Sequence, residues 1–306
     1  MRDDRRCARA SRSPGRTGLI RILRVLAPNP GIRELEGTNT WIVGDGPSIA
    51  IDPGPDDAGH LREVAREAGH LAAILLTHDH PDHAPGAAAL AAATAAPVYA
   101  ARPPEGAKRL TDGQRIVVGD VVLTAIATPG HTPDHIAYFD ERHRSLFTGD
   151  AVLGRGTSVI DPPEGDLTSY LRSLRRMREL SPSVIYPGHG PVVLDAPGKL
   201  EEYVQHRAAR EEQVLAALAS GVRTPEEIVP AIYGDHPADL HPLAARSVLA
   251  HLLKLENEGR AERRTTAGAV RWTLLEPRTC VRCGRPVKGR GLLCGPCSLA
   301  VLQESG

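Results

Sequence analysis

The sequence HDHPDH occupies residues 78–83 of this 306-residue chain, directly after the apolar run AAILLT (72–77), which predicts a buried strand. His78, His80, Asp82 and His83 therefore lie within six residues, in a loop at a strand end. Burying so many polar side chains without partners would be costly, so a purely structural role in a core is a poor explanation. Imidazole and carboxylate groups are ligands that suit Zn²⁺ and similar cations. We therefore expect a metal site at this loop.

Three further candidate ligands follow, each in a glycine-containing loop at a predicted strand end. They are His131 in TPGHT (128–132), Asp150 in FTGD (147–150) and His189 in YPGHG (186–190). A glycine before each ligand permits a sharp turn that aims the side chain. We expect all seven side chains to converge on one centre.

The set HxHxDH, then a later His, a later Asp and a last His, resembles the metallo-β-lactamase superfamily, and all seven ligand positions are filled. The resemblance covers about residues 19–200. It implies an αββα sandwich with two metals at one edge between its sheets. It also implies the ligand sets: the first metal is held by His78, His80 and His131, the second by Asp82, His83 and His189, and Asp150 bridges the two. Two zinc ions are favoured, with iron or manganese left open.

Several neighbouring residues have expected roles in this centre. Asp52 in IDPG matches the early Asp of the family and is expected to orient a ligand histidine or its loop. Thr77 either does the same or is only a strand residue. Asp150 and Asp82 are the expected catalytic ligands, and Asp82 could also relay a proton. His135 is a candidate acid for the leaving group, against a packing role.

Charge counting and metal chemistry suggest the reaction. Two divalent cations outweigh the two aspartates and a shared hydroxide, and the five histidines are neutral, so net positive charge remains. Such a pair lowers the pKa of the bound water toward about 7 and holds the attacked group. We therefore expect a metal-dependent hydrolase that acts on an anionic or carbonyl-bearing substrate.

The remaining pattern predicts an α/β layered domain over residues 19–205, followed by a winged-helix domain over 206–276. In the first, expected strands lie at 19–27, 40–43, 48–51, 72–77, within 114–148 and at 183–190, with helices at 57–69, 86–96 and 166–180. In the second, expected helices lie at 200–219, 224–233 and 243–258, before a hairpin of 259–264 and 269–275.

The substrate class depends on finer resemblances. Only 38 residues separate Asp150 from His189, too few for the large inserted domain of the long RNA-processing members. RVLAPNPG (24–31), GTNTWIVG (37–44) and the winged helix resemble the lactamase-beta-like endoribonuclease group, which implies cleavage of phosphodiesters in single-stranded RNA. Two alternatives stay open: a thioester or lactone hydrolase of the glyoxalase II type, and a nucleic-acid-binding regulator with a vestigial pocket. Seven intact ligands argue against the regulator.

The charge of the winged helix does not favour duplex binding. Residues 221–276 carry seven basic and eight acidic side chains, whereas a duplex-binding module should be basic. Only the wing, with Arg260, Arg263, Arg264 and Arg271, suits phosphate. Packing or control of substrate access is the favoured role, and a homodimer is left open.

The last 30 residues, 277–306, hold four cysteines as Cys280-x₂-Cys283-x₁₀-Cys294-x₂-Cys297. This spacing favours one structural Zn²⁺ in a short zinc-ribbon-like tail, with two dithiols or disulfides as the alternative. The basic residues Arg282, Arg285, Lys288 and Arg290 could contact RNA or a partner protein.

The first 18 residues are rich in arginine and lack an apolar stretch, so we expect a disordered basic leader rather than a secretory signal. No run approaches the roughly 20 apolar residues needed to cross a bilayer, and the formal net charge is zero. The expected location is the cytoplasm, with no membrane partner.

Overall fold

The computed structural model describes residues 20–235, 237–266, 268–275 and 282–283. The predicted leader therefore lies outside the described residues. So do Cys280, Cys294 and Cys297 of the predicted zinc tail, while Cys283 is exposed. The tail's structural zinc stays a prediction.

The first sheet has the strand order β1-β2-β3-β4-β5-β6. Ile42, Ala50 and Ile74 face the helices on its outer side, and Trp41, Ile49 and Leu75 face the second sheet. This alternation is the period of a strand buried on both faces. Its strands are β1 (Ile22–Leu26), β2 (Asn39–Val43), β3 (Pro47–Ile51), β4 (His70–Leu75), β5 (Val98–Ala100) and β6 (Lys108–Arg109), and its helices are α1 (Ala58–Ala68) and α2 (Gly86–Thr94).

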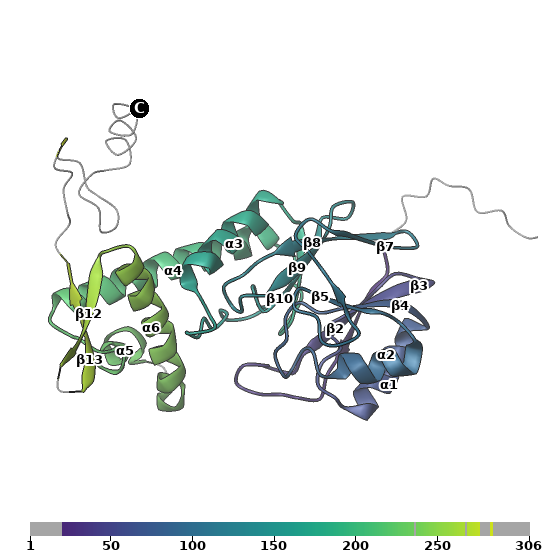
Figure 1. Cartoon of the computed structure of the whole chain (residues 1–306), viewed down its shortest axis with the longest axis horizontal. Coiled ribbons are helices and arrows are strands. Elements are labelled where there is room, and N and C mark those ends of the chain that lie inside the picture. Colours follow the sequence, from purple (N-terminus) through teal and green to yellow (C-terminus); the bar gives the residue numbers. More distant parts are fainter. Residues whose placement is uncertain (1–19, 236, 267, 276–281, 284–306) are drawn as a thin grey trace, which may run out of the picture.

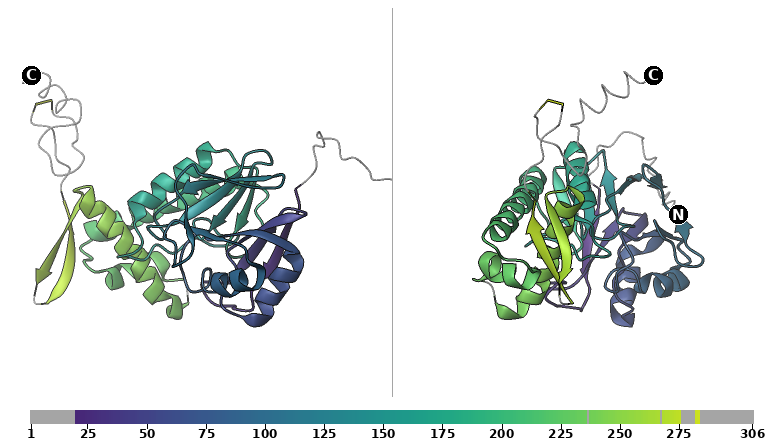
Figure 2. Two further views of the ribbon diagram at one scale, coloured as in Figure 1. Left: turned by 45° about the vertical axis from the view of Figure 1, so that its right-hand side comes forward. Right: turned by 60° about the vertical axis from the view of Figure 1, so that its left-hand side comes forward.

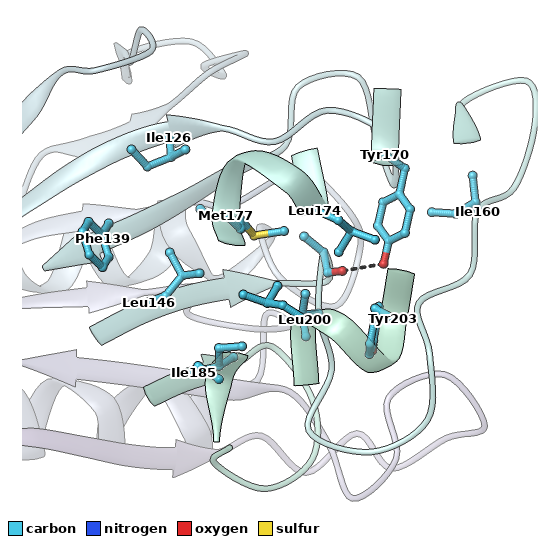
Figure 3. Close-up of a cluster of buried hydrophobic side chains, with 14 of the residues drawn as sticks. Ile126, Phe139, Leu146, Ile160, Tyr170, Leu174, Met177, Ile185, Leu200 and Tyr203 are labelled. Carbon is cyan, nitrogen blue, oxygen red and sulfur yellow. Dashed lines mark hydrogen bonds between the residues drawn. The ribbon is translucent and has the colours of Figure 1, made fainter. Parts of the chain in front are cut away.

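The second sheet has the order β11-β10-β9-β8-β7 and packs on the first through Phe147, Tyr138 and Leu123. Its outer face carries α3 (Leu167–Glu179) and the start of α4 (Ala196–Ala219), joined by the apolar cluster of Figure 3. The helices thus lie on opposite sides of the paired sheets (Figure 2), which is the expected αββα layering. The strands are β7 (Arg115–Val118), β8 (Val121–Ala127), β9 (Ile136–Asp140), β10 (Ser145–Gly149) and β11 (Val184–Pro187).

The C-terminal unit is the predicted winged helix, at the left of Figure 1. Trp272 and Val248 are buried in a separate apolar cluster, and Thr224 begins one helix with a capping box to Glu227. Its elements after α4 are α5 (Pro225–Tyr233), the 3₁₀ turn η1 (Ala238–Leu240), α6 (His241–Asn257), β12 (Ala261–Thr266) and β13 (Ala269–Leu274).

Three arginines of the wing already have acidic partners. Arg260 lies 2.7 Å from Glu211, Arg263 lies 3.3 Å from Glu256, and Arg264 lies 2.5 Å from Glu262. Charges that are paired in this way have less attraction for phosphate. The pairing agrees with a packing or access role for the winged helix.

Helix α4 joins the two units. Leu200 and Tyr203 pack in the cluster of α3, whereas Val214 and Leu218 pack with the winged helix. The predicted boundary at 205/206 therefore falls inside this helix.

Two local features differ from the sequence prediction. Helix α4 begins at Ala196 rather than at residue 200, because the Asp195 side chain caps the backbone N–H of Gly198. The short strands β5 and β6 carried no periodic signal and were not predicted.

Among the described residues, no helix is both long and apolar enough to traverse a bilayer.

Candidate active site

The seven predicted ligands come from loops at strand ends of both sheets. The loop between β4 and α2 carries His78, His80, Asp82 and His83, while the β8–β9 loop carries His131. Asp150 directly follows β10, and His189 follows β11 by two residues. The fold brings all seven to one edge of the sandwich.

The side chains form two groups in which the potential ligand atoms all lie within 4.8 Å of one another. One group contains His78, His80, His131 and Asp150, and the other contains Asp82, His83, Asp150 and His189. Asp150 belongs to both, as expected of a bridging carboxylate. The grouping is the one that the family resemblance implied.

Close contacts between like groups suit a site that binds cations. His131 Nε2 lies 3.1 Å from His80 Nδ1, and His83 Nε2 lies 3.1 Å from His189 Nε2. His78 Nε2 and Asp150 Oδ1 are buried without a hydrogen-bond partner among the described residues. Buried polar atoms normally have partners, so a pair of divalent cations fits this donor set. The cluster is a candidate dinuclear metal site.

Each ligand histidine is also held through its other ring nitrogen. Main-chain carbonyls hold His131 and His189: Val159 O lies 2.8 Å from His131 Nδ1, and Gly37 O lies 3.2 Å from His189 Nδ1. The carboxylate of Glu164 lies 3.5 Å from His80 Nε2. Such contacts fix the ring orientation and the tautomer. None of these three partners was predicted, because each is distant in sequence and carries no motif.

Asp52 holds the two remaining histidines, one of them through Thr77. Its Oδ2 lies 2.9 Å from His83 Nδ1 and accepts a hydrogen bond of 2.7 Å from Thr77 Oγ1. Thr77 Oγ1 lies 2.9 Å from His78 Nδ1. Asp52 has a φ of 52°, a left-handed conformation that costs energy in a residue with a Cβ. Both residues therefore stand where an orienting role was expected, and for Thr77 the geometry favours that role over a plain strand residue.

Glycines leave room for this packing at two points. A Cβ on Gly149 would lie 2.5 Å from Thr77 Oγ1, and one on Gly188 would lie 2.7 Å from Asp150 Oδ1. Larger side chains would displace the orienting threonine or the bridging carboxylate. These glycines are thus needed for close approach as well as for turning.

The electrostatics of the cluster suit cation binding. Burial opposes ionisation of Asp150, but His189 and His83 beside it hold the pKa of that carboxyl well below its usual value. Burial likewise opposes protonation of His189, yet Asp150 and Asp82 raise its pKa to about 10. A field that attracts a proton so strongly also attracts a metal cation.

His135, the candidate leaving-group acid, lies behind the ligands rather than in front of them. Its ring centroid is 5.1 Å from that of His78, and its Nδ1 lies 2.8 Å from Thr128 Oγ1. It is buried, it does not line the cavity described next, and burial holds its pKa well below the ordinary value. The packing role therefore replaces the acid role for this residue.

A cavity of about 760 Å³ opens onto the ligands. His80, Asp82, His131 and Asp150 line one side of it. Residues of helices α4 and α6 and of the end of α5 also line it, so both units contribute to the cavity. Apolar and aromatic residues of both units line much of the rest: Ile32, Leu35, Leu153, Tyr233, Leu240, Leu243 and Ala244.

Comparison with known proteins agrees with this architecture. Residues 33–189 match the family described as "Metallo-beta-lactamase superfamily", and residues 224–272 match "Beta-lactamase associated winged helix domain". The lactamase-like protein vrtG of Penicillium aethiopicum is 39% identical over 254 residues, covering 76% of this chain and 80% of its own. The atrochrysone carboxyl ACP thioesterase of Aspergillus chevalieri is 35% identical over 272 residues, covering 83% and 87%.

A solved structure superposes on most of the chain. The metallo-β-lactamase family protein TTHA1429 of Thermus thermophilus superposes with a TM-score of 0.70 at 25% identity, covering 84% of this chain and 98% of its own. Fold, ligand grouping and sequence similarity agree, and this chain belongs to the metallo-β-lactamase superfamily, with a β-lactamase-associated winged-helix domain after the metal-binding domain.

Proposed function

We propose that this protein hydrolyses acyl thioesters at a dinuclear zinc centre. The observation that carries the proposal is the cavity, in which the metal ligands are exposed and apolar side chains of both units form part of the remaining lining. Such a cavity can hold an acyl chain with its carbonyl against the metals. The similarity to an acyl-carrier-protein thioesterase over 83% of the chain supports the same class.

The cations would supply an activated water and would polarise the carbonyl of the substrate. The protein's own part is to hold the ligands in place before substrate arrives, through Asp52, Thr77 and the carbonyls described above. Asp82 lines the cavity and its pKa is far below the ordinary value, so it stays ionised beside the attacked group. Despite burial, which raises that pKa, the charge of His83 and the hydrogen bonds from His189 and His83 keep it low.

The leaving group also favours a thioester. A thiol with a pKa of about 8.5 leaves as the thiolate without help, whereas an alkoxide needs an acid. His135, the acid proposed from the sequence, is buried behind His78 and away from the cavity. A thioester needs no such residue.

Two of the arginines that line the cavity, Arg155 and Arg33, already have acidic partners and are less available to RNA, the substrate that the sequence pattern favoured. Arg155 pairs with Glu36 at 2.7 Å, and Arg33 lies 3.9 Å from Asp161. A site for a phosphodiester chain would be expected to keep such cations available for phosphates. RNA cleavage therefore ranks second and is tested beside the thioester.

The test incubates the zinc-loaded protein with acyl N-acetylcysteamine thioesters of increasing chain length and with a single-stranded RNA. We expect thioester turnover that Asp150→Ala lowers by about 10³-fold or more, since it removes the shared ligand. Asp79→Ala is the matched control, because Asp79 is an exposed carboxylate in the same loop and belongs to neither ligand group. RNA cleavage that Asp150→Ala abolishes, without thioester turnover, would reverse the ranking. Elemental analysis of the protein purified from cells tests zinc against iron and manganese.

A further inference from the structure

The part of the cavity lining that helix α4 contributes contains a buried cation without an acidic partner. Arg207 of α4 is 3% exposed and lines the cavity. Among the described residues, no carboxylate lies within ion-pair distance of its guanidinium, and its Nε has no hydrogen-bond partner. Its contacts include a hydrogen bond from Nη2 to the carbonyl of Ser158, a hydrogen bond with the side chain of Tyr170, and the face of that ring, 5.3 Å away. A buried charge of this kind is costly unless something pairs with it.

Three neighbours on the same wall also have unused polar atoms. His206 Nδ1, Arg210 Nε and His241 Nε2 are buried and have no hydrogen-bond partner among the described residues, and all three residues line the cavity. Arg210 contacts the ring of Tyr233 at 4.4 Å and lies 2.8 Å from Gln213, but no described carboxylate pairs with it. Unsatisfied groups that share one wall indicate a ligand that would satisfy them together.

The charges around Arg207 favour an anionic ligand. Burial, then the charges of Arg207 and Arg210, lower the pKa of His206 to about 4, which leaves this imidazole neutral at pH 7. Nearby carboxylates have cationic partners: Glu202, whose charge acts on His206, pairs with Lys199 at 2.9 Å, Glu211 with Lys254 at 2.6 Å, and Asp161 with Arg246 at 2.5 Å. Of the three acids that line the cavity, Asp82 and Asp150 belong to the metal centre, and the third is Glu34. The wall formed by α4 and α6 is therefore electropositive.

We propose that Arg207, with Arg210, His206 and His241, binds a carboxylate on the acyl part of the substrate. This inference rests on the proposed thioester hydrolysis and specifies its substrate class. A guanidinium recognises a carboxylate through charge-assisted hydrogen bonds, and Arg207 offers its free Nε–H for one of them. Because Arg207 is buried, it suits the inserted acyl group better than the phosphate of a carrier arm, which would remain nearer the mouth.

The test compares half-thioesters of adipic, suberic and sebacic acid with the methyl esters of the same compounds, as N-acetylcysteamine derivatives. For the best-fitting length we expect wild-type kcat/KM to favour the free carboxylate about 10- to 100-fold, as for a hydrogen-bonded charge pair. Arg207→Gln should reduce this ratio to about one, and Arg210→Gln should reduce it partly. Arg207→Lys should retain part of it. Arg175→Gln, at an exposed arginine of α3 outside the cavity lining, should leave it unchanged.

A structural role of Arg207, through Ser158, would lower turnover of both members of a pair equally and leave the ratio intact, which would overturn the proposal. A wild-type kcat/KM ratio of about one at every chain length would also overturn the proposal. This result needs no variant, so the proposal can be tested even if Arg207→Gln does not fold. A further experiment compares the pantetheine thioester with the phosphopantetheine thioester of one neutral acyl group. If Arg207→Gln changes the preference between those two, the cation binds the carrier phosphate and the acyl assignment is wrong.

A binding measurement tests the carboxylate site even if the protein does not hydrolyse thioesters. If no thioester is hydrolysed, calorimetry on the zinc-loaded protein still compares suberate with its monomethyl ester. Tighter binding of suberate that is lost in Arg207→Gln would support the carboxylate site for another reaction. Equal binding of the two would overturn the site as well.

Discussion

The metal-ligand wall of the cavity and the winged-helix wall differ in how their polar side chains are held. On the ligand wall, Asp52, Thr77 and several carbonyls fix the histidines through their second ring nitrogens, at the expense of a strained φ of 52° at Asp52. On the other wall, Arg207 and His206 keep polar atoms without partners. A metal centre must be organised before substrate arrives, whereas a recognition wall needs free hydrogen-bonding capacity. Under the two proposals above, the chemistry belongs to one wall and selectivity to the other.

The largest expected effects concern stability and zinc content, and they come from replacing Trp272 in the winged helix and Trp41 in the metal-binding unit. Trp272 is 1% exposed in the core of the winged helix, which shares no residue with the other three apolar clusters. Trp272→Ala should lower the free energy of unfolding of this unit by about 3–5 kcal/mol through the cavity it leaves. Zinc content should stay at the wild-type level. Thermal unfolding and elemental analysis measure the two effects.

Trp41→Ala is the counterpart in the metal-binding unit. Trp41 packs against Tyr186 and donates a hydrogen bond of 2.9 Å to the carbonyl of Pro187, two residues before His189. We expect this change to lower zinc content as well as stability. If Trp272→Ala instead empties the metal site, the two units are not separable and the division fails.

The same comparison explains what could be predicted from sequence. The metal ligands could be recognised from their spacing. His78, His80, Asp82 and His83 lie close together in one loop, and a glycine precedes each of the later three ligands. Periodicity gave the helices and most strands, because each buries one face or both faces of a regular element. Asp52 was recognisable through its IDPG context.

The rest depended on contacts between distant segments. Glu164 reaches His80 across 84 positions, and Gly37 reaches His189 across 152, with no local signal for either. Arg207 belongs to no motif, and only the docking of α4 on the loop containing Ser158 buries it. His135 looked like a site residue from its motif, yet the backbone places it behind His78.

A smaller effect is expected from Asp52→Asn on the ligand wall. The new amide would place an N–H₂ group or a weaker acceptor against His83 Nδ1, now 2.9 Å from the carboxylate. Loss of such an orienting carboxylate typically lowers metal affinity by about 10- to 100-fold. Competition with a chromogenic chelator measures the change.

Asp57→Asn is the matched control, because Asp57 caps α1 and asparagine caps equally well. It should leave zinc affinity at the wild-type value. An Asp52→Asn protein with unchanged affinity would show that the ligand wall is not organised through this residue.

The smallest expected effect concerns how the free energy of unfolding depends on pH through a histidine of α6. His251 of α6 is 2% exposed with no hydrogen-bond partner on either ring nitrogen among the described residues. Burial, followed by the charges of Arg207 and Lys254, lowers its pKa to about 3. Unfolded, it should titrate near about 6.5. Between these values the unfolded chain binds a proton that the folded chain does not, so stability is complete above about pH 6.5 and falls as the pH decreases.

Replacing this histidine removes that contribution. In His251→Leu, the loss of unfolding free energy between about pH 8 and about pH 5.5 should be smaller than in the wild type by about 1 kcal/mol. Chemical denaturation at the two pH values measures it, and release of metal by acid cancels because both proteins keep the same ligands. Equal pH dependence in the two proteins would mean that His251 takes up its proton in the folded state. In that event neither burial nor the charges of Arg207 and Lys254 would hold its pKa down in the folded chain.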